Sequence, residues 1–361
     1  MNIKDFDHLQ DDKRIRIKEE NVNGHTFFII SYMIGDNDLW NKPLAAECRG
    51  ITFAADGNCV CRPFHKFFNV NENQSTQLDD IRDRSFEILE KRDGSMITPV
   101  LVGDDIVWKS KKSFYSDLAI EAGKNVPSEI EEFSRRMIYA GWTPIFEYTS
   151  PNSRIVIDYG QQPEYVLLSM RDIESGVYLT YPAMEYLAFK YEIPLISRYS
   201  VTIDDCINEI DTLTDFEGWV LRDRNGFHCK LKTAWYLRNH RAKTELRERD
   251  VADMVVNETI DDIKSSLALD GYDLSPIEHI EREVNRDFSY MQQYVDHVVK
   301  NIKDKTDYKS IALEYGNDAY FNLIMSEVRG KEPDYKKYWK NDFRDTYGLN
   351  TVYSNFGGKN E

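Results

Sequence analysis

Residues 90–95 read EKRDGS, which places Lys91 just before a turn signal and between two strand-like runs. A lysine in such a place can attack the α-phosphate of a nucleotide and form a phosphoramidate, provided that desolvation or nearby cations keep it partly neutral. The simpler alternative is a hairpin turn on Asp93-Gly94 that carries two solvated cations. The short pattern alone does not separate these two interpretations.

Four further charged residues follow Lys91 and favour the chemical interpretation. Glu147 lies in the strand-like run FEY, Glu217 precedes the run GWV, and Lys230 and Lys232 flank a leucine. Side chains alternate along a strand, so the two lysines share a face and can meet one polyphosphate. The glutamates could hold a ribose hydroxyl, a lysine or a divalent cation. Singly, each residue also fits a strand-edge carboxylate or a solvated sheet face, and only their shared order along the chain favours chemistry.

Several familiar catalytic signatures are absent from the sequence. There is no GxxxxGK[ST] phosphate loop, no GxGxxG, no HExxH and no GxSxG. A nucleotide would therefore be bound without the usual phosphate cradle.

The elements that must position these residues are mostly short strands. Runs rich in β-branched and aromatic residues occupy residues 25–32, 50–53, 86–89, 96–102, 105–109, 143–148, 165–170 and 218–222. Turn signals at Asp56-Gly57, Asp93-Gly94 and Asn225-Gly226 separate several of them. A helix is expected over residues 128–140, where Gly141 would end it. The pattern predicts an α+β fold of mostly antiparallel sheets with helices packed against them.

After about residue 245 the pattern becomes helical. Residues 275–278 read SPIE, which predicts a capping box with proline at the first helical position. Apolar residues then recur every three or four positions as far as Ile302, the mark of one long amphipathic helix. A second helix is expected over residues 317–329, ended by Gly330. We predict a first domain over residues 1–245 and an all-helical domain over residues 246–361.

The sequence resembles the covalent nucleotidyltransferase superfamily of polynucleotide ligases and RNA capping enzymes, and most closely the bacteriophage RNA ligase 1 family of T-even phage tRNA-repair ligases. Beyond the motifs above, matching segments are SY at 31–32, ECRG at 47–50, KFFN at 66–69, KSK at 109–111, NSRIV at 152–156, HCKLK at 228–232 and WY at 235–236. The resemblance implies an antiparallel-sheet nucleotidyltransferase domain, unrelated to ATP-grasp folds. The helical tail matches loosely, as expected if it tunes the substrate.

The resemblance implies a three-step, ATP-dependent ligation of RNA. Lys91 forms lysyl-AMP, the AMP passes to an RNA 5′-phosphate, and a 3′-hydroxyl displaces AMP. By matching position, the phosphate-binding cations would be Arg49, Lys66, Lys230 and Lys232, with Lys111 as a further contact. Glu147 would bind the ATP ribose, and Glu217 would position the lysine or a metal. Tyr32 resembles an ATP-contacting tyrosine, Tyr236 an essential aromatic, and Asp261 a ligand of Mg²⁺, the expected cofactor.

Simpler roles are open for the residues outside the core motifs. Arg49 could form a surface pair with Glu47, and Lys66 could be a rim lysine over core aromatics. Arg154 could contact an RNA end or form a structural ion pair. Four more residues could be core or cap positions rather than contacts, namely Tyr32, Trp235, Tyr236 and Asp261. Cys229 is most simply a small buried side chain.

Composition limits the classes of protein. The 361 residues carry a net charge of −16, which argues against coating nucleic acid or an anionic membrane by bulk charge. Residues 222–249 nevertheless hold nine Lys and Arg against three acids, a local basic segment beside the proposed site where an RNA end could be steered. The alternative for its second half is a charge-mixed solvated helix. No apolar run approaches roughly 18 residues, and residues 1–14 are too charged for a signal peptide.

Five scattered cysteines indicate reduced thiols in a cytoplasmic protein, in the host cytoplasm if a phage encodes it. The expected partner is RNA with 5′-phosphate and 3′-hydroxyl ends, single-stranded or tRNA, and we expect a monomer without a membrane partner. Rival interpretations are a DNA ligase or a capping enzyme, which would carry an OB-fold after the last motif, and a non-catalytic RNA-end-binding protein, which need not keep a nucleophile.

Overall fold

The computed structural model describes residues 1–33, 37–153, 155–240, 246–269, 273–302, 304–348 and 350–353. Contacts divide the chain into two compact units. The first comprises Met1–Ala242 with Ala268–Asp270, and the second comprises Lys243–Leu267 with Gly271–Glu361. Arg154, for which the sequence left two roles open, lies outside the described residues.

The first unit begins with a four-stranded antiparallel sheet in the order β1-β2-β3-β4, built from β1 (Ile15–Val22), β2 (His25–Tyr32), β3 (Arg49–Ala54) and β4 (Cys59–Cys61). One face packs on short helices that include η1 (Ile3–Leu9), α1 (Asn37–Trp40) and η2 (Ala45–Glu47), around Phe6, Ile30 and Phe53. Strand β2 ends at Tyr32 and strand β3 begins at Arg49, so this sheet carries two of the predicted ATP contacts.

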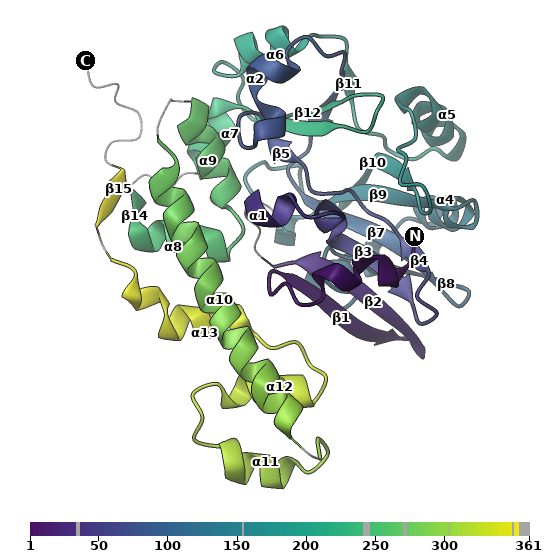
Figure 1. Cartoon of the computed structure of the whole chain (residues 1–361). Coiled ribbons are helices and arrows are strands. Elements are labelled where there is room, and N and C mark those ends of the chain that lie inside the picture. Colours follow the sequence, from purple (N-terminus) through teal and green to yellow (C-terminus); the bar gives the residue numbers. More distant parts are fainter. Residues whose placement is uncertain are drawn as a thin grey trace. The chain divides into compact units, whose positions relative to one another are not determined.

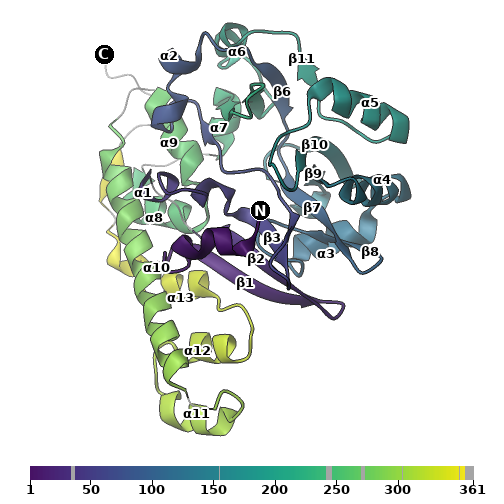
Figure 2. The ribbon, with the colours of Figure 1, turned by 45° about the vertical axis from the view of Figure 1, so that its right-hand side comes forward.

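A second antiparallel sheet has the order β10-β9-β7-β8, from β7 (Ser95–Val102), β8 (Asp105–Lys109), β9 (Trp142–Thr149) and β10 (Glu164–Asp172). Helices α3 (Asp117–Asn125), α4 (Ser128–Tyr139) and α5 (Tyr181–Tyr191) supply side chains to an apolar cluster with this sheet, centred on Trp108, Phe133 and Phe146. Both views show α4 and α5 beside β9 and β10 (Figures 1 and 2). The short helix η4 (Pro151–Ser153) follows β9.

The third sheet has the order β11-β6-β12-β13-β5, and only its last pair is parallel. Its strands are β5 (Phe68–Asn69), β6 (Glu87–Lys91), β11 (Arg198–Tyr199), β12 (Gly218–Arg222) and β13 (His228–Lys232). One face, with Ile88, Trp219 and Leu231, packs near η3 (Gln74–Thr76), α2 (Leu78–Ile81) and α6 (Ile203–Glu209). On the other face Leu89 clusters with Val166 of β10, so the second and third sheets pack against each other. Helix α7 (Ala234–His240) follows β13.

The α+β prediction is confirmed, and all eight expected strands are present within a few residues. The interpretation of Asp93-Gly94 as a hairpin turn is wrong. Strand β6 pairs with β11 and β12, whereas β7 pairs with β8 and β9, so the segment crosses between two sheets. Asn225-Gly226, by contrast, joins the paired strands β12 and β13 as a hairpin.

The second unit is mainly helical, as predicted. Its helices are α8 (Glu248–Val256), α9 (Ile260–Leu269), which extends into residues of the first unit, α10 (Ser275–Asn301), α11 (Tyr308–Tyr315), α12 (Phe321–Val328) and α13 (Tyr335–Asp342), and η5 (Arg344–Thr346) follows. The stripe of α10 is buried from Ile277 to Val298, and Phe288 stacks on the buried Trp339. A short antiparallel sheet of β14 (Leu246–Arg247) and β15 (Thr351–Tyr353), which the sequence did not predict, adds to the helices.

Two details of this unit differ from prediction. Ser275 does not form a capping box, because Leu274 is the N-cap and the Ser275 hydroxyl donates to Asp273 at 2.6 Å. The second predicted helix begins four residues later than expected, at Phe321, while Gly330 ends the segment with φ +67°. Among the described residues no helix is long and apolar enough to cross a membrane. All five cysteines are free thiols, as predicted.

Candidate active site

Lys91, Gly218 and Lys232 form one row across the third sheet. Gly218 of β12 is directly opposite Lys91 of β6 on one side and Lys232 of β13 on the other. Directly opposite residues share a face, so both ammonium groups project from the same side. A Cβ on Gly218 would lie 2.0 Å from the Leu231 carbonyl oxygen, and its φ is +146°. The row therefore requires glycine between the two lysines.

Glu217 binds both lysines of this row. Its Oε1 lies 2.8 Å from Nζ of Lys91 and 3.0 Å from Nζ of Lys232, and the glutamate side chain is 2% exposed. Its Oε2 is also buried and has no hydrogen-bond partner in the part of the chain that the structure describes. A buried carboxylate oxygen without a partner is costly, so this atom is suited to a cation or a donor brought in by a ligand.

Glu147 enters the site from the second sheet. Glu147 of β9 is paired with Val166 of β10. Val166 packs with Leu89 of β6, which lies two residues before Lys91. The pKa of Glu147 is raised to about 7, mainly by burial and also by the charge of Glu217, which together outweigh the lowering effects of Lys91 and Arg49. A Cβ on Gly94 would meet the Tyr148 carbonyl oxygen at 2.7 Å and Glu147 Cγ at 2.9 Å. Gly94 thus lets the turn that follows Lys91 pack directly on β9, the strand that carries Glu147.

Arg49 and Lys230 flank one aromatic ring. The guanidinium carbon of Arg49 is 5.4 Å from the ring centroid of Phe67, and Lys230 Nζ is 5.8 Å from it. The alternative that Arg49 pairs with Glu47 is not observed, because the Glu47 carboxylate binds Arg62 at 3.0 Å and Arg171 at 2.7 Å. Arg49 Nη1 is buried, and no described residue forms a hydrogen bond with it. Like Glu217 Oε2, it is a polar atom prepared for a ligand of the opposite charge.

A second aromatic group is formed by Tyr32, Trp40 and Phe68. Two lysines, Lys66 and Lys111, lie against it. Lys66 Nζ lies 4.9 Å from the centroid of Phe68 and also 3.4 Å from Glu72 Oε1. Lys111 Nζ lies 3.8 Å from the centroid of Tyr32. The alternative of a lysine over aromatics is thus present for Lys66, and the same aromatic group holds Lys111.

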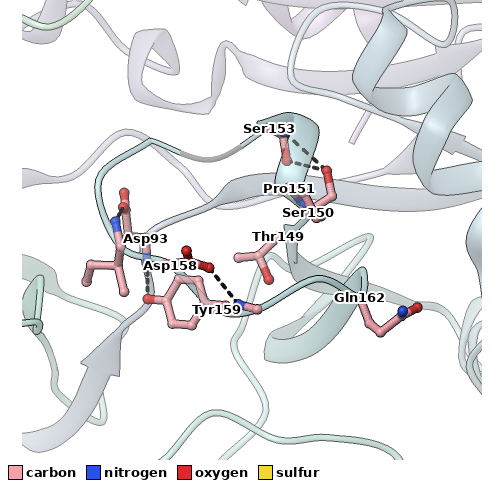
Figure 3. A pocket seen from close by; sticks show the side chains of 10 residues that line it. Asp93, Thr149, Ser150, Pro151, Ser153, Asp158, Tyr159 and Gln162 are labelled. Atoms are coloured by element: carbon pink, nitrogen blue, oxygen red, sulfur yellow. Dashed lines mark hydrogen bonds between the residues drawn. The ribbon is translucent and has the colours of Figure 1, made fainter.

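Asp93, in the turn that follows Lys91, forms hydrogen bonds with two other segments of the chain. Its Oδ2 accepts the backbone N–H groups of Val156 and Ile157 at 2.8 Å each, and its Oδ1 accepts the Tyr236 hydroxyl at 2.7 Å. The Tyr159 hydroxyl in turn accepts the N–H of Asp93 at 2.9 Å, as Figure 3 shows. Asp93, Ile157 and Tyr159 also line a small hollow that contains several hydroxyl groups. One of these, Thr149 Oγ1, is buried and has no hydrogen-bond partner among the described residues.

The structure therefore collects most of the predicted site residues within the first unit. The candidate nucleophile Lys91 groups with Glu147, Glu217 and Lys232, and cations on two aromatic groups adjoin them. Tyr236 is 2% exposed, with its hydroxyl committed to Asp93, which differs from the expectation of a direct phosphate or RNA contact. Asp261 lies in α9 in the second unit, and in the described part of the chain no three His, Cys, Asp or Glu side chains gather into a ready metal site.

Sequence reasoning missed three residues of this site. Phe67 was grouped with core aromatics, yet both Arg49 and Lys230 lie near its ring. Glu72 holds both Lys66 and the amide of Asn69, to which its Oε2 is 2.7 Å away. Tyr159 also lies 4.0 Å under the Arg92 guanidinium. A charged residue next to two aromatics was a visible signal for Phe67, whereas no local pattern marks Glu72 or Tyr159.

The fold is that of ATP-dependent polynucleotide ligases. The chain aligns with the structure "Putative ATP-dependent DNA ligase from Aquifex aeolicus" with a TM-score of 0.50, over 82% of this chain and 80% of that one. The two sequences are 14% identical, so this likeness concerns the fold alone.

The sequence profile of the RNA ligase family matches residues 47–236, more than half of the chain, and the chain belongs to this family. It is 31% identical over 247 residues to "Putative RNA ligase" of Thermovibrio ammonificans, covering 65% of this chain and 64% of that protein. It is 29% identical over 224 residues to "RNA ligase 1" of bacteriophage TS2126, covering 58% and 55%. The chain thus matches less than two thirds of the length of these curated relatives.

Proposed function

We propose that this protein is an ATP-dependent RNA ligase that joins 5′-phosphate and 3′-hydroxyl ends through lysyl-AMP and RNA-adenylate intermediates. The observation that carries the proposal is the Lys91–Glu217–Lys232 bridge, in which one carboxylate oxygen holds the candidate nucleophile beside a second lysine. The membership of the chain in the RNA ligase family supports it.

In the first step the neutral amine of Lys91 attacks the α-phosphorus of ATP. A P–N bond forms, the bond to pyrophosphate breaks, and the amine loses a proton. Lys232 is within reach of the same Glu217 oxygen, so it can offset charge as it builds on the leaving group. Lys230, Arg49 and Lys66 would serve the other phosphates, and Glu147 would hold the ribose.

In the later steps AMP moves from Lys91 to the RNA 5′-phosphate, and then leaves when the 3′-hydroxyl forms the new phosphodiester bond. Both steps again move negative charge onto phosphate oxygens, which the same cations can stabilise. Transfer of AMP to the RNA breaks the P–N bond and frees the Lys91 amine to pair with Glu217 again. Lys111 and Arg154 remain proposed contacts for phosphate or RNA.

The chemistry of the site fits a divalent cation. Glu217 Oε2 is a buried carboxylate oxygen without a hydrogen-bond partner among the described residues, the type of donor that Mg²⁺ prefers. When bound, Mg²⁺ would offset negative charge on the phosphates. Glu217 would hold it, and Asp261 remains a proposed Mg²⁺ ligand.

The finer assignment is repair of cleaved tRNA, with single-stranded RNA ends as the general substrate class. The basic segment over residues 222–249 supports steering of an RNA end. The domain over residues 246–361 would set substrate preference. We propose that the protein acts as a monomer in the cytoplasm, in that of the host if a phage encodes it.

Incubation with α-labelled ATP and Mg²⁺ tests the proposal. We expect a label on the protein that is acid-labile and alkali-stable, followed by sealing of RNA with a 5′-phosphate and a 3′-hydroxyl. Label from GTP instead would indicate capping chemistry, and preferential sealing of nicked DNA would indicate a DNA ligase. No label from either nucleotide would favour a non-catalytic RNA-end-binding protein.

A further inference from the structure

Gly50 is the extra residue of a β-bulge that lies directly after Arg49. Strand β2 pairs Ile30 with Ile51 and then Ser31 with Arg49, so Gly50 has no partner in the ladder. Its φ is +92°, in the region that favours glycine. A bulge of this kind changes the direction in which the neighbouring side chain points. Arg49 is that neighbour.

The carbonyl oxygen of Gly50 leaves the ladder and accepts a hydrogen bond from the Lys109 ammonium at 3.0 Å. The Thr52 hydroxyl donates to the same oxygen at 3.0 Å. A Cβ on Gly50 would lie 2.4 Å from the Lys111 carbonyl oxygen and 3.2 Å from Lys109 Nζ. The end of β8 is therefore packed directly against the bulge.

Lys109 is a costly residue at this place. Its side chain is 0% exposed, and burial lowers its pKa, while Cys61 and Glu20 act in the opposite direction. The carbonyl of Gly50 is its one hydrogen-bond acceptor among the described residues. A buried ammonium with one acceptor destabilises a fold compared with an apolar residue of the same shape.

The groups around Lys109 do not depend on it for the stability of the fold. Gly50 also accepts from Thr52, and Glu20 keeps a 2.8 Å ion pair with Lys18 and a 2.8 Å hydrogen bond from the Phe114 N–H. Methionine, with a similar length and no charge, would fill the same space. The presence of lysine therefore calls for a role other than stability.

We propose that Lys109 is a positioning residue that fixes the Gly50 bulge and thereby aims the Arg49 guanidinium at the ATP phosphates. The proposal rests on the function proposed above, in which Arg49 binds those phosphates. The geometry places Arg49 over Phe67, and its buried Nη1, which has no hydrogen-bond partner among the described residues, can bind an anion. Loss of the hydrogen bond from Lys109 would let the Gly50 bulge change conformation and would misplace the Arg49 guanidinium, while every group proposed to contact ATP would remain.

Lys109→Met in the full-length protein tests this role. We expect an unfolding midpoint equal to or above that of wild type, together with a loss of at least tenfold in the rate constant of self-adenylylation at saturating ATP. Lys109→Gln keeps a donor for the Gly50 carbonyl and should recover most of the rate. The matched control is Thr98→Val, because Thr98 is directly opposite Lys109 and buried but does not touch Gly50. It should adenylylate at the wild-type rate.

A double-mutant cycle separates positioning from a general structural effect. In an Arg49→Ala background, Lys109→Met should cause no further loss, because Lys109 acts through Arg49. A full additional loss in that background, or a wild-type rate in the single variant, would overturn the proposal.

A crystal structure of Lys109→Met gives a readout independent of the reaction. We expect the Gly50 carbonyl to turn and the Arg49 guanidinium to leave the Phe67 ring. If wild type forms no adduct but Arg49 moves, the proposed function fails while the positioning role stands. If Arg49 stays on Phe67, the positioning role fails whatever the activity.

Discussion

The Tyr236 hydroxyl donates a 2.7 Å hydrogen bond to Oδ1 of Asp93, two residues after the candidate nucleophile Lys91. The two residues are 143 positions apart in the chain. The ring of Tyr236 also lies 4.8 Å from Lys232 Nζ. One tyrosine thus links the turn that carries Lys91 to the strand that carries the lysine sharing Glu217. This relationship gives Tyr236 a structural role between two of the candidate site residues.

Tyr236→Phe should slow self-adenylylation while keeping the ring in place. Loss of a hydrogen bond to a charged, buried acceptor costs roughly 1.5–3 kcal/mol, and part of this cost should appear as misplacement of Lys91. Single-turnover rates with ATP provide the measurement. The matched control is Tyr181→Phe, because Tyr181 is also buried and its hydroxyl donates to the Ile196 carbonyl at 2.9 Å. An equal loss of rate in both variants would contradict a specific role for the Asp93 contact.

Lys91→Ala should abolish the covalent label, because the phosphoramidate needs this amine. The variant should still seal RNA that already carries a 5′-adenylylated end, since that step needs only the phosphate-binding cations. Gel assays of labelled protein and of pre-adenylylated RNA measure the two steps separately. Persistent self-adenylylation would show that another residue is the nucleophile.

The sequence could predict the elements of this site better than their mutual placement. Alternation in the run around Leu231 correctly put Lys230 and Lys232 on one face, because this pattern is local and Leu231 is buried in the apolar cluster of the opposite face. The hairpin expected at Asp93-Gly94 is absent, because a turn dipeptide does not show which strands pair on either side of it. Only strand pairing shows that it joins different sheets.

Long-range polar contacts account for most of what the sequence could not predict. The partners of Asp93 come from residues 156, 157, 159 and 236, and no periodicity relates them. Glu47 stands two residues from Arg49 but binds Arg62 and Arg171, because the fold brings these guanidinium groups to it. The capping box at Ser275 failed for a related reason, since Asp273 competes for the same hydroxyl.

Glu147 should make stability depend on pH in a direction unusual for a carboxylate. Its native pKa of about 7 lies above the ordinary value of 4.5, so the native state holds a proton that the unfolded chain releases between these values. The free energy of unfolding should therefore fall as pH rises from about 4.5 to 7, by up to roughly 3 kcal/mol from this group. Glu147→Gln lacks this dependence. Chemical denaturation across pH should show that the free energy of unfolding of the variant rises relative to that of wild type up to about pH 7. A difference that is constant with pH would contradict the raised pKa of Glu147.

The paired lysines of β13 provide the sharpest separation between chemistry and stability. Lys232→Ala removes a cation bound to Glu217 at 3.0 Å, and Lys230→Ala removes one that lies beside Phe67 and Arg49. Each loss should cost on the order of 3 kcal/mol in the adenylylation barrier, or about a hundredfold in rate. Saturating ATP should not rescue it, because the charge that the lysines offset grows as pyrophosphate leaves.

Leu231→Ala is the matched variant between the two lysines, because Leu231 is 3% exposed on the apolar face. It should lower the free energy of unfolding by roughly 2–5 kcal/mol while leaving the adenylylation rate per folded molecule close to that of wild type. Denaturant titrations and single-turnover rates on the three variants give both quantities. A slow but stable Leu231→Ala, together with active Lys230→Ala and Lys232→Ala, would contradict the strand register that places both lysines on the phosphate face.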